Sequence, residues 1–425
     1  MAGRSTIKVI LNAYACNPCR GSEEGVGWNW VRMISAFADP WVLVASFHRQ
    51  SIENFQANNP QEMRNVTFVY VPQKPWHYRP TPVWKWIEGS AFKPVMNMAY
   101  ALWLRDAFKV ARRLHREQRF DLAHQLTYVG FRFPGRLWKL DIPFVWGPIG
   151  GLENTPWHFL PVLGWKGAAY YAGRNVINSL QKLTLRSSRK AFQRAAVAIA
   201  ATSGIQREIK RWYGVDSRVI CEVGPPEMRV ESINPRGEGE PLCILWSGEH
   251  LPGKALPLLL QALSQTADTV HWQLDILGDG PSCKSWRRLA DDLGVGGQCH
   301  WLGSLSREEA LAMMKQGHLF VITSLKDLTS TVLLEAFSLG LPVICPDHCG
   351  FADVVDSSCG IKIPMNSPAG LIDGMKAAIE SVCEDEQRRR AMAEGAIHRA
   401  GMFSWEKKQA VLEALYEEAL ASCSG

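Results

Sequence analysis

Two carboxylates in the second half of the chain have the types and spacing of an anion- and diol-binding site. Asp327 lies in the loop after a predicted strand, residues 319–323, and Glu335 lies in the predicted helix that follows, residues 331–339. The N–H groups at a helix start are a ready anion site, and a carboxylate further in can accept paired hydrogen bonds from a ribose diol. The alternative is that Asp327 caps the helix and Glu335 is a surface charge.

A lysine offers the cation that such a site needs. Leu328 and Thr329 follow Asp327 directly, so we expect their backbone N–H groups to face the same ligand. Lys254 lies in the loop between a predicted strand, residues 243–246, and a helix from residue 256. From such a loop a lysine reaches phosphate oxygens as a mobile point charge. An ordinary solvated lysine is the alternative.

The first half contains a glycine-rich stretch after its first strand. Residues 21–27 have the spacing G-x-x-x-G-x-G, which departs from the dinucleotide-binding fingerprint. We expect a loop in which glycine allows the backbone to approach a ligand closely. Glu23 and Glu24 would repel an anion, so we expect them to face a sugar or an attacking hydroxyl.

A histidine at a strand end is the other candidate in the first half. His124 ends the predicted strand 121–124 and precedes Thr127. A histidine in that position of a central cleft can donate to substrate hydroxyls or take a proton. A histidine with a purely structural role is the alternative.

Predicted strands and helices alternate along the chain and must position these groups. In the first half, residues 7–13 form an apolar strand, 28–37 a helix, 94–119 a long helix and 180–195 a basic helix. Strands separated by helices of this length predict parallel β-α-β units. In such sheets, ligands bind beyond the carboxyl ends of the strands.

The amino-acid composition changes at a polar segment rich in proline and glycine. Residues 231–241 are typical of a linker. They separate residues 1–230 from a second α/β series at 242–402. We therefore expect two doubly wound α/β domains with a cleft between them.

The charge is divided unevenly between these halves. The 425 residues are 47% hydrophobic and 21% charged, with a formal net charge of +6. Residues 1–235 contain 31 Lys and Arg against 16 Asp and Glu, whereas the rest contains 16 against 25. The asymmetry predicts an anionic partner for the first half, such as nucleic acid, a phosphorylated substrate or a membrane surface. No nucleic-acid-binding motif accompanies it, so we expect no nucleic acid partner.

Composition also argues against several other classes of protein. The 11 cysteines have no framework spacing, and Cys16 and Cys19 form an isolated C-x-x-C, so we expect reduced thiols and no metal site. No uncharged run reaches the roughly 18 residues of a membrane-spanning helix. The first residues lack the apolar core of a signal peptide. We expect a cytoplasmic protein.

Four motifs of the second half together resemble a known family. They are Trp246-Ser-Gly248 followed by Lys254, Leu277-Gly-Asp-Gly-Pro281, Trp301-Leu-Gly303, and Asp327-x7-Glu335-Ala-x3-Gly340-x-Pro342. In this order they resemble the retaining glycosyltransferases of family 4, also called glycosyl transferases group 1. That family has the GT-B fold, in which two Rossmann-like domains face a central cleft. The resemblance covers roughly residues 5–420 and is strongest over 243–364.

The resemblance implies a role for each candidate residue. The second domain would bind a nucleoside diphosphate sugar, UDP- or GDP-linked, with Lys254 on the diphosphate and Glu335 on the ribose. Asp327 would lie near the donor sugar and act in catalysis together with His124. The donor-binding residues implied are Gly25, Gly248, Lys254, Gly278, Leu328, Thr329 and Glu335. The acceptor-side residues implied are Glu23, Glu24 and Thr127.

Three departures from the family pattern affect these roles. Glu249 stands where the family has an arginine that partners the lysine on phosphate, which should weaken diphosphate binding unless another cation compensates. Asp327 is one methylene shorter than the usual glutamate. The cleft histidine of the family aligns nearest to Leu126, although His124 is close.

The resemblance implies transfer with retention and no metal or cofactor beyond the sugar donor. The nucleoside diphosphate leaves as an anion that Lys254 and the helix start stabilise. The acceptor would be a hydroxyl of a glycan or lipid-linked molecule at the membrane surface, in cell-envelope or exopolysaccharide synthesis. A C-terminal helix, within residues 403–425, is expected to pack back on the first domain.

Two segments interleave tryptophans with basic residues, at 76–86 and 157–166. Bulky aromatics beside Lys and Arg suit a contact with the headgroups of an anionic membrane, in this case on the cytoplasmic face of the inner membrane. The alternative is that these tryptophans are core or sugar-stacking residues.

Two further functions remain as alternatives. The first is a non-catalytic GT-B protein that binds or scaffolds, which Asp327 and Glu249 favour. The second is an isomerase of the same fold that acts on nucleotide sugars.

Overall fold

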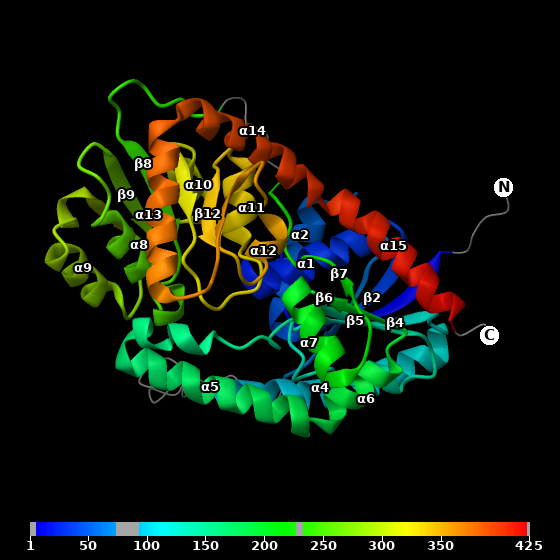
Figure 1. Cartoon of the computed structure of the whole chain (residues 1–425). Coiled ribbons are helices and arrows are strands. Elements are labelled where there is room, and N and C mark those ends of the chain that lie inside the picture. The colour runs from blue at the N-terminus through cyan, green and yellow to red at the C-terminus, as the bar shows by residue number, and fades with distance from the viewer. Residues whose placement is uncertain (1–5, 74–92, 227–232, 423–425) are drawn as a thin grey trace.

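The computed structural model of the chain describes residues 6–73, 93–226 and 233–422. It contains two parallel sheets, each with helices on both faces (Figure 1). The first sheet has the order β3-β2-β1-β4-β5-β6-β7, and the second has the order β10-β9-β8-β11-β12-β13. Both are doubly wound, so the expected pair of Rossmann-like domains is confirmed.

The first domain is built from residues up to the end of β7. Its strands are β1 (Ile7–Ala13), β2 (Ala38–Ala45), β3 (Thr67–Val71), β4 (Leu122–Thr127), β5 (Phe144–Ile149), β6 (Val197–Ala200) and β7 (Arg218–Val219). Its α-helices are α1 (Ser22–Ser35), α2 (Arg49–Asn58), α4 (Lys93–Gln118), α5 (Gly164–Thr184), α6 (Arg186–Arg194) and α7 (Ser203–Tyr213). Short 3-10 helices are η1 (Ser46–His48), η4 (Leu137–Lys139) and η5 (Trp157–Leu163).

The second domain repeats the same plan. Its strands are β8 (Leu242–Ser247), β9 (Trp272–Leu277), β10 (Cys299–Gly303), β11 (Leu319–Val321), β12 (Val343–Pro346) and β13 (Gly360–Ile363). Its α-helices are α8 (Leu256–Leu263), α9 (Cys283–Asp292), α10 (Arg307–Met314), α11 (Thr331–Ser338), α12 (Phe351–Val354), α13 (Pro368–Glu384) and α14 (Glu386–Met402). The 3-10 helices are η6 (Pro252–Lys254) and η7 (Gly296–Gln298), and the last helix is α15 (Trp405–Ala421).

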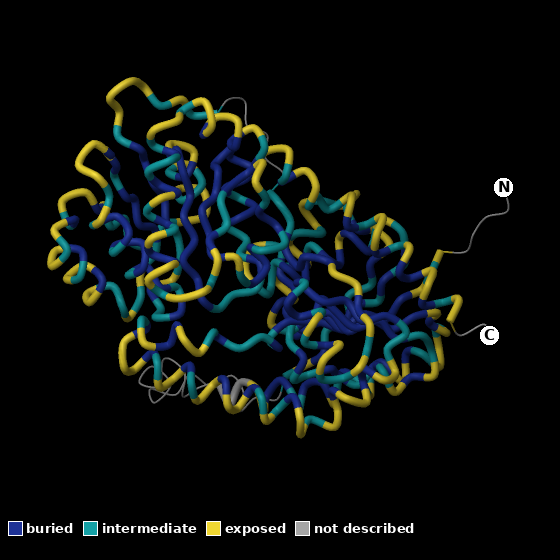
Figure 2. Tube along the Cα trace, in the orientation of Figure 1, coloured by how far each residue is buried: buried dark blue, intermediate teal, exposed yellow. Residues whose placement is uncertain are grey.

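The central strands supply the core of each domain. Val9, Ile10 and Leu11 of β1 are fully buried, as are Ile244 and Leu245 of β8. Figure 2 shows the same pattern, with buried sheets inside exposed helix faces. Strand order reverses between β1 and β4 and between β8 and β11. At these reversals the loops that follow the strands diverge and leave room for a ligand.

The glycine-rich stretch is helical, which corrects our expectation of a loop. Helix α1 begins at Ser22 and contains both Gly25 and Gly27. A Cβ atom on Gly27 would lie 1.9 Å from the carbonyl oxygen of Ala15, and one on Gly25 would lie 2.7 Å from that of Arg20. These glycines therefore let the first turns of α1 lie against the loop after β1.

The predicted basic helix 180–195 is also wrong in its bounds. The structure has two helices there, α5 and α6, which meet at Leu185, where ψ is 86° and the helical hydrogen bonding is interrupted. Helices α2 and α7 were not predicted from the sequence. The long helix predicted at 94–119 is confirmed as α4.

The last helix crosses from the second domain to the first (Figure 1). Helix α14 packs on α11, whereas α15 packs on α1, β5 and β6. The Tyr416 hydroxyl lies 2.7 Å from Nδ1 of His124, and both side chains are fully buried. At the start of α15, the Trp405 ring lies against Gly224, where a Cβ atom would be only 2.5 Å away.

A buried carboxylate joins the two domains. Glu222, just after β7, is 3% exposed, and its Oε1 accepts a 2.8 Å hydrogen bond from the Thr329 N–H of the second domain. Its backbone carbonyl accepts from the Trp30 indole of α1. The buried Lys408 of α15 donates to the neighbouring carbonyl of Val223. Burial raises the pKa of Glu222 to about 7.

Within the described residues, none of the helices combines the length and apolar character that crossing a bilayer requires.

The raised pKa of Glu222 predicts a pH-dependent stability. Between about pH 4.5 and pH 7 the unfolded carboxyl loses its proton while the folded one keeps it. The free energy of unfolding should therefore fall by about 3 kcal/mol across this window and level off above it. Glu222→Gln should remove this part of the slope, measured by denaturant unfolding from pH 5 to pH 8.

The exposed Glu394 of α14 offers a matched control, because Glu394→Gln should leave the slope unchanged. Parallel curves for the wild type and Glu222→Gln would contradict the buried-carboxylate interpretation.

Candidate active site

The lysine and the first carboxylate predicted from the sequence meet in the structure. Lys254 ends η6, after β8, and Asp327 lies in the loop between β11 and α11. Their Nζ and Oδ2 atoms are 2.5 Å apart, and each side chain is about a quarter exposed. The Lys254 carbonyl accepts from the hydroxyl of Thr323, which fixes the lysine loop to the end of the neighbouring strand. The pair therefore occupies the carboxyl end of the second sheet at its switch point.

The second carboxylate is held by an arginine that the sequence did not indicate. Glu335 lies in α11, and its Oε1 accepts from Nε and Nη2 of Arg307 at 3.0 and 2.9 Å. The Glu335 side chain is 13% exposed, whereas Arg307 is 61% exposed at the start of α10. This arrangement orients the carboxylate, with an exposed partner that can move into solvent.

Two glycines predicted near the donor lie in touching loops. Gly278 has a φ of +116°, and a Cβ atom there would lie 2.1 Å from the carbonyl oxygen of Gly248. Only glycine combines this backbone conformation with such an approach. The loops after β8 and β9 are therefore in direct contact at the carboxyl end of the sheet.

The two N–H groups expected to face the donor are already engaged. The Leu328 N–H donates to Oδ1 of Asp327 at 3.0 Å. The Thr329 N–H donates to Glu222 and is buried. In this state the two N–H groups fix the loop and join the domains, and anion binding by them stays a prediction.

His124 does not face a cleft, which corrects its predicted catalytic role. Its side chain is fully buried, with Nδ1 bonded to Tyr416 and Nε2 2.7 Å from the Gly147 carbonyl. Burial lowers its pKa to about 4, so the ring is neutral. Thr127 is likewise buried, and its hydroxyl bonds the backbone of Ala15. Both residues are structural, because β4 lies at the centre of the sheet and its side chains face packed helices.

The acidic pair at the start of α1, Glu23 and Glu24, lies beside the loop that follows β4. Glu23 accepts from the Val129 N–H after β4. Burial raises its pKa to about 7. Glu24 lies 3.5 Å from Nε of Arg20, and Gly25 follows them in the same turn. Glu23 is thus a carboxyl that can gain or lose a proton near neutral pH at the first domain's switch point.

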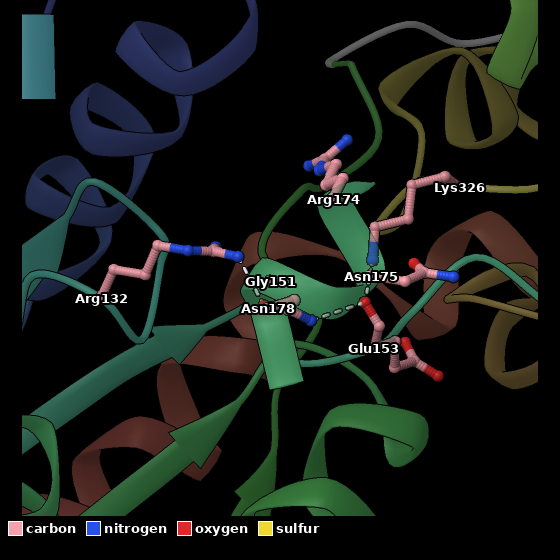
Figure 3. Close-up of a pocket in the computed structure, with 7 residues that line it drawn as sticks. All are labelled: Arg132, Gly151, Glu153, Arg174, Asn175, Asn178 and Lys326. Atoms are coloured by element: carbon pink, nitrogen blue, oxygen red, sulfur yellow. Dashed lines mark hydrogen bonds between the residues drawn. The ribbon is translucent and has the colours of Figure 1, made fainter. Parts of the chain in front are cut away.

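A narrow pocket between the domains gathers cations that the sequence did not bring together (Figure 3). Its side chains leave no space in it for a water molecule in this structure. We call it the cation pocket, and it is lined by Arg132, Gly151, Glu153, Arg174, Asn175, Asn178 and Lys326. Lys326 directly precedes Asp327, so the pocket adjoins the donor-side carboxylate.

Amide side chains of α5 hold the pocket wall in place. Asn175 bonds the N–H and the carbonyl of Thr155. Asn178 donates to the Leu152 carbonyl and accepts from Nη2 of Arg132 at 2.5 Å. Gly151 makes room for that guanidinium, since a Cβ atom there would lie 3.2 Å from Nη1. The segment after β5 is thereby fixed against the inner side of α5.

The pocket shifts the pKa of its ionisable groups in the directions expected for burial. Desolvation, with repulsion from Arg174, lowers the pKa of Arg132 to about 10 and that of Lys326 to about 8. Desolvation also raises the pKa of Glu153. One carboxyl oxygen of Glu153 is buried without a hydrogen-bond partner. Three cations and the carboxyl group of Glu153 thus lie close together beside Asp327.

Two observations bear on the departures from the family pattern. Glu249 is exposed on the loop after β8. Potential metal ligands gather in the second domain at His250, Asp279 and Cys283, whose ligand atoms lie within 4.8 Å of one another. His250 is also surrounded by the rings of Trp246, Trp286 and Trp301.

Part of the chain is similar to a known family. Residues 229–399 match the family model described as glycosyl transferases group 1. The chain is 27% identical over 187 residues to D-inositol 3-phosphate glycosyltransferase of Corynebacterium glutamicum (strain R). That alignment covers 42% of this chain and 44% of the relative, so it spans less than half of either protein.

Two solved structures resemble the chain over nearly its whole length. Sucrose-phosphate synthase from Thermosynechococcus elongatus superposes with a TM-score of 0.67 at 15% identity, covering 98% of this chain and 100% of that one. Anabaena HepE in complex with UDP gives 0.59 at 15% identity, with coverage of 97% and 100%. At such identities the likeness establishes the fold. The second domain is therefore similar to the glycosyl transferases group 1, and the chain as a whole has the GT-B fold of two facing Rossmann-like domains.

Proposed function

We propose that the protein is a retaining, metal-independent glycosyltransferase that moves a hexosyl group from a UDP- or GDP-sugar to a hydroxyl of a glycan or lipid-linked acceptor. The observation that carries the proposal is the Lys254–Asp327 pair at the carboxyl end of the second sheet, with Glu335 further along in α11. A cation for phosphates and carboxylates for hydroxyls, side by side at a switch point, suit a nucleotide sugar.

The proposed reaction exchanges one bond at the anomeric carbon for another. The bond from that carbon to the diphosphate oxygen breaks, and a bond to the acceptor oxygen forms on the same face. The acceptor proton passes to the departing phosphate, so no protein base is required. Lys254 stabilises the charge that develops on the nucleoside diphosphate, which is where a fixed charge lowers the barrier most.

The ion pairs suggest how the donor is received. A diphosphate carries more negative charge than one carboxylate, so it competes with Asp327 for the ammonium of Lys254. Released from that pair, the Asp327 carboxylate can accept hydrogen bonds from sugar hydroxyls. In the same way, ribose hydroxyls compete for Glu335 with the exposed Arg307. Both carboxylates are thereby held in place by a cation until the donor arrives.

Helix α5 supplies the surface that we assign to the membrane. Its inner side is polar, with buried Asn175, Asn178 and Lys182. Its outer α5 face is apolar and exposed, by 78% at Trp165 and by 40–58% at the others. The residues of that outer face are Trp165, Tyr170, Val176, Ile177, Leu180 and Leu183. A helix of a folded protein ordinarily shows the opposite arrangement, so this face is suited to an apolar partner.

The charge around α5 favours an anionic bilayer as that partner. From residue 154 to residue 207 the chain has no acidic residue and eight basic ones. Exposed Lys166 and Arg186 flank the outer α5 face at its two ends. Trp157, in η5, is 53% exposed and lies in the aromatic segment predicted from the sequence. The other aromatic segment, residues 76–86, lies outside the described residues. Apolar contact and basic charge together give peripheral membrane binding.

The proposed activity predicts sugar transfer that survives removal of divalent metals. Purified protein, membranes and a panel of radiolabelled UDP- and GDP-sugars should give labelled product equally well with and without EDTA, because Lys254 supplies the charge that a metal otherwise would. Absence of transfer and of nucleotide release with every donor would instead indicate a scaffold protein. Interconversion of the donor sugar alone would indicate an isomerase. Loss of activity in EDTA would point to a metal at the His250 group.

Removing either donor-site charge should weaken nucleotide binding. Lys254→Ala and Glu335→Ala should each raise the dissociation constant for the nucleoside diphosphate by about thirtyfold or more, roughly 2 kcal/mol, measured by calorimetry. Lys315→Ala and Glu394→Ala change exposed residues elsewhere on the second domain and should leave it unaltered. Unchanged affinity in both site variants would overturn the assignment of the donor site.

The membrane assignment predicts salt-sensitive flotation. The protein should float with vesicles of phosphatidylglycerol and phosphatidylcholine at low salt, and less so at high salt as the charges are screened. The double variant Ile177→Gln, Leu180→Gln should lose most of this binding, because it removes apolar area from the outer α5 face. Val411→Gln, at a residue 49% exposed on α15, is the control. Flotation of the double variant at wild-type levels would refute the assignment.

A further inference from the structure

A buried histidine of the second domain has no hydrogen-bond partner for either ring nitrogen. His250, in the loop after β8, is 1% exposed, and both its Nδ1 and Nε2 atoms are buried without a partner. Among the histidines that the structure describes, it alone has both nitrogens in this state. A neutral imidazole carries one donor and one acceptor, and leaving such groups unsatisfied in the interior is costly. The ring is therefore placed to bind a ligand.

Two further side chains offer ligand atoms beside this ring. The carboxylate of Asp279 and the sulfur of Cys283 lie within 4.8 Å of a ring nitrogen of His250 and of one another. We call these three residues the His250 group. Asp279 follows β9 and is exposed, whereas Cys283 begins α9 and is half-buried. One nitrogen, one sulfur and one oxygen donor around a point that solvent can reach form the ligand set of a site for a borderline-soft metal ion.

Backbone contacts hold the His250 group together. The His250 N–H donates to the Asp279 carbonyl at 2.9 Å, and the His250 carbonyl accepts from the Ser282 N–H at 3.0 Å. The Cys283 N–H donates to the carbonyl of Gly280 at 3.0 Å. Gly280 has a φ of +155°, and a Cβ atom there would lie 2.9 Å from the backbone nitrogen of His250. The main chain thus gathers the ligand atoms before any ion binds, which lowers the cost of ordering them.

Aromatic rings surround the histidine. The ring centroids of Trp246, Trp286 and Trp301 lie 5.6, 5.1 and 5.8 Å from that of His250. Such an apolar shell limits the access of water to a bound ion. Burial also lowers the pKa of His250, which favours the neutral ring that a metal ion requires.

We propose that the His250 group binds a zinc ion through the imidazole of His250, the thiolate of Cys283 and one carboxylate oxygen of Asp279. Zinc takes nitrogen, sulfur and oxygen ligands together, whereas magnesium and calcium prefer oxygen alone. The thiol releases its proton to solvent as it binds, so the thiolate and the carboxylate neutralise the two charges of the ion. Oδ1 of Asp279 accepts from the Gly280 N–H at 2.7 Å, which leaves Oδ2 for the ion. A water molecule completes the four ligands.

The ligand atoms reach the ion by small side-chain movements. Bonds of about 2.0–2.3 Å place the ligand atoms of a tetrahedral zinc ion roughly 3.5 Å apart. The separations in the His250 group extend up to 4.8 Å. Rotation of the exposed Asp279 and the half-buried Cys283 side chains closes this difference while the buried ring stays in place.

The ion serves the structure of the second domain and takes no part in the chemistry of transfer. It fastens the loop after β8, which continues from His250 to Lys254, to the loop after β9 and the start of α9. The carboxylates assigned to the donor, Asp327 and Glu335, are not members of the His250 group. The inference is therefore separate from the proposed transfer, for which Lys254 supplies the charge.

Zinc titration of the reduced full chain, first stripped of metal with EDTA, tests the proposal. Competition with a chromophoric chelator should show one zinc ion per chain, with a dissociation constant of about 1 μM or lower. Cys283→Ala and Asp279→Asn should each weaken zinc binding by about tenfold or more, because each removes one ligand. Cys19→Ala and Asp268→Asn, at exposed residues outside the His250 group, are the matched controls and should bind zinc as the wild type does.

Two further measurements identify the sulfur ligand and check the fold of the variants. Cobalt in place of zinc should give a thiolate-to-cobalt charge-transfer absorption in the wild type and in Cys19→Ala, but not in Cys283→Ala. Zinc should raise the melting temperature of the wild type and of both controls, since it binds the folded state, but not that of Cys283→Ala. Without zinc, all four variants should melt with the wild type, which reports that they are folded. Excess magnesium should not displace the zinc.

Three results would overturn the proposal. The first is a wild type that takes up no zinc in the micromolar range, and the second is an unchanged affinity in both Cys283→Ala and Asp279→Asn. The third is an equal loss in Cys19→Ala, which would place the ion at the C-x-x-C of the first domain. Zinc binding without sugar transfer leaves the site standing while the proposed function fails. Transfer without zinc binding refutes the site alone.

Discussion

The burial of one carboxylate between the domains is the constraint that organises this molecule. Glu222 lies in low-dielectric surroundings, where an unsatisfied charge would be costly. Its carboxylate is held by the Thr329 N–H, and its backbone carbonyl by Trp30. One residue thus fixes α1 of the first domain to the loop that carries Asp327 in the second. The donor-side loop cannot shift without exposing or abandoning that carboxylate.

The last helix, α15, adds further contacts between the two domains beside Glu222. Helix α15 reaches the first domain from the second, with Lys408 beside the joint and Tyr416 bonded to His124. The first domain also contacts the second through η5 and α5, which pack against α13 and η6.

Charge in this protein works through a few placed groups and not through bulk composition. The second half is acidic overall, yet Lys254 and Lys326 lie in loops at the carboxyl end of its sheet. The first half is basic, and its charge divides between two sides of α5, with arginines toward the pocket and exposed basic residues around the apolar face. The exposed Glu249 lies on the loop after β8 and does not line the cation pocket.

The sequence by itself determined the two α/β domains, because an alternation of buried strands and helices is a local pattern. It also indicated Lys254, Asp327 and Glu335, which follow strands whose carboxyl ends meet at one edge of a parallel sheet. Only the tertiary structure decided which groups meet. Arg307 reaches Glu335 from another helix, and His124 is turned into the core by Tyr416, 292 residues away. No spacing reports such contacts, because a side chain at a strand end faces a cleft or a core according to what packs over it.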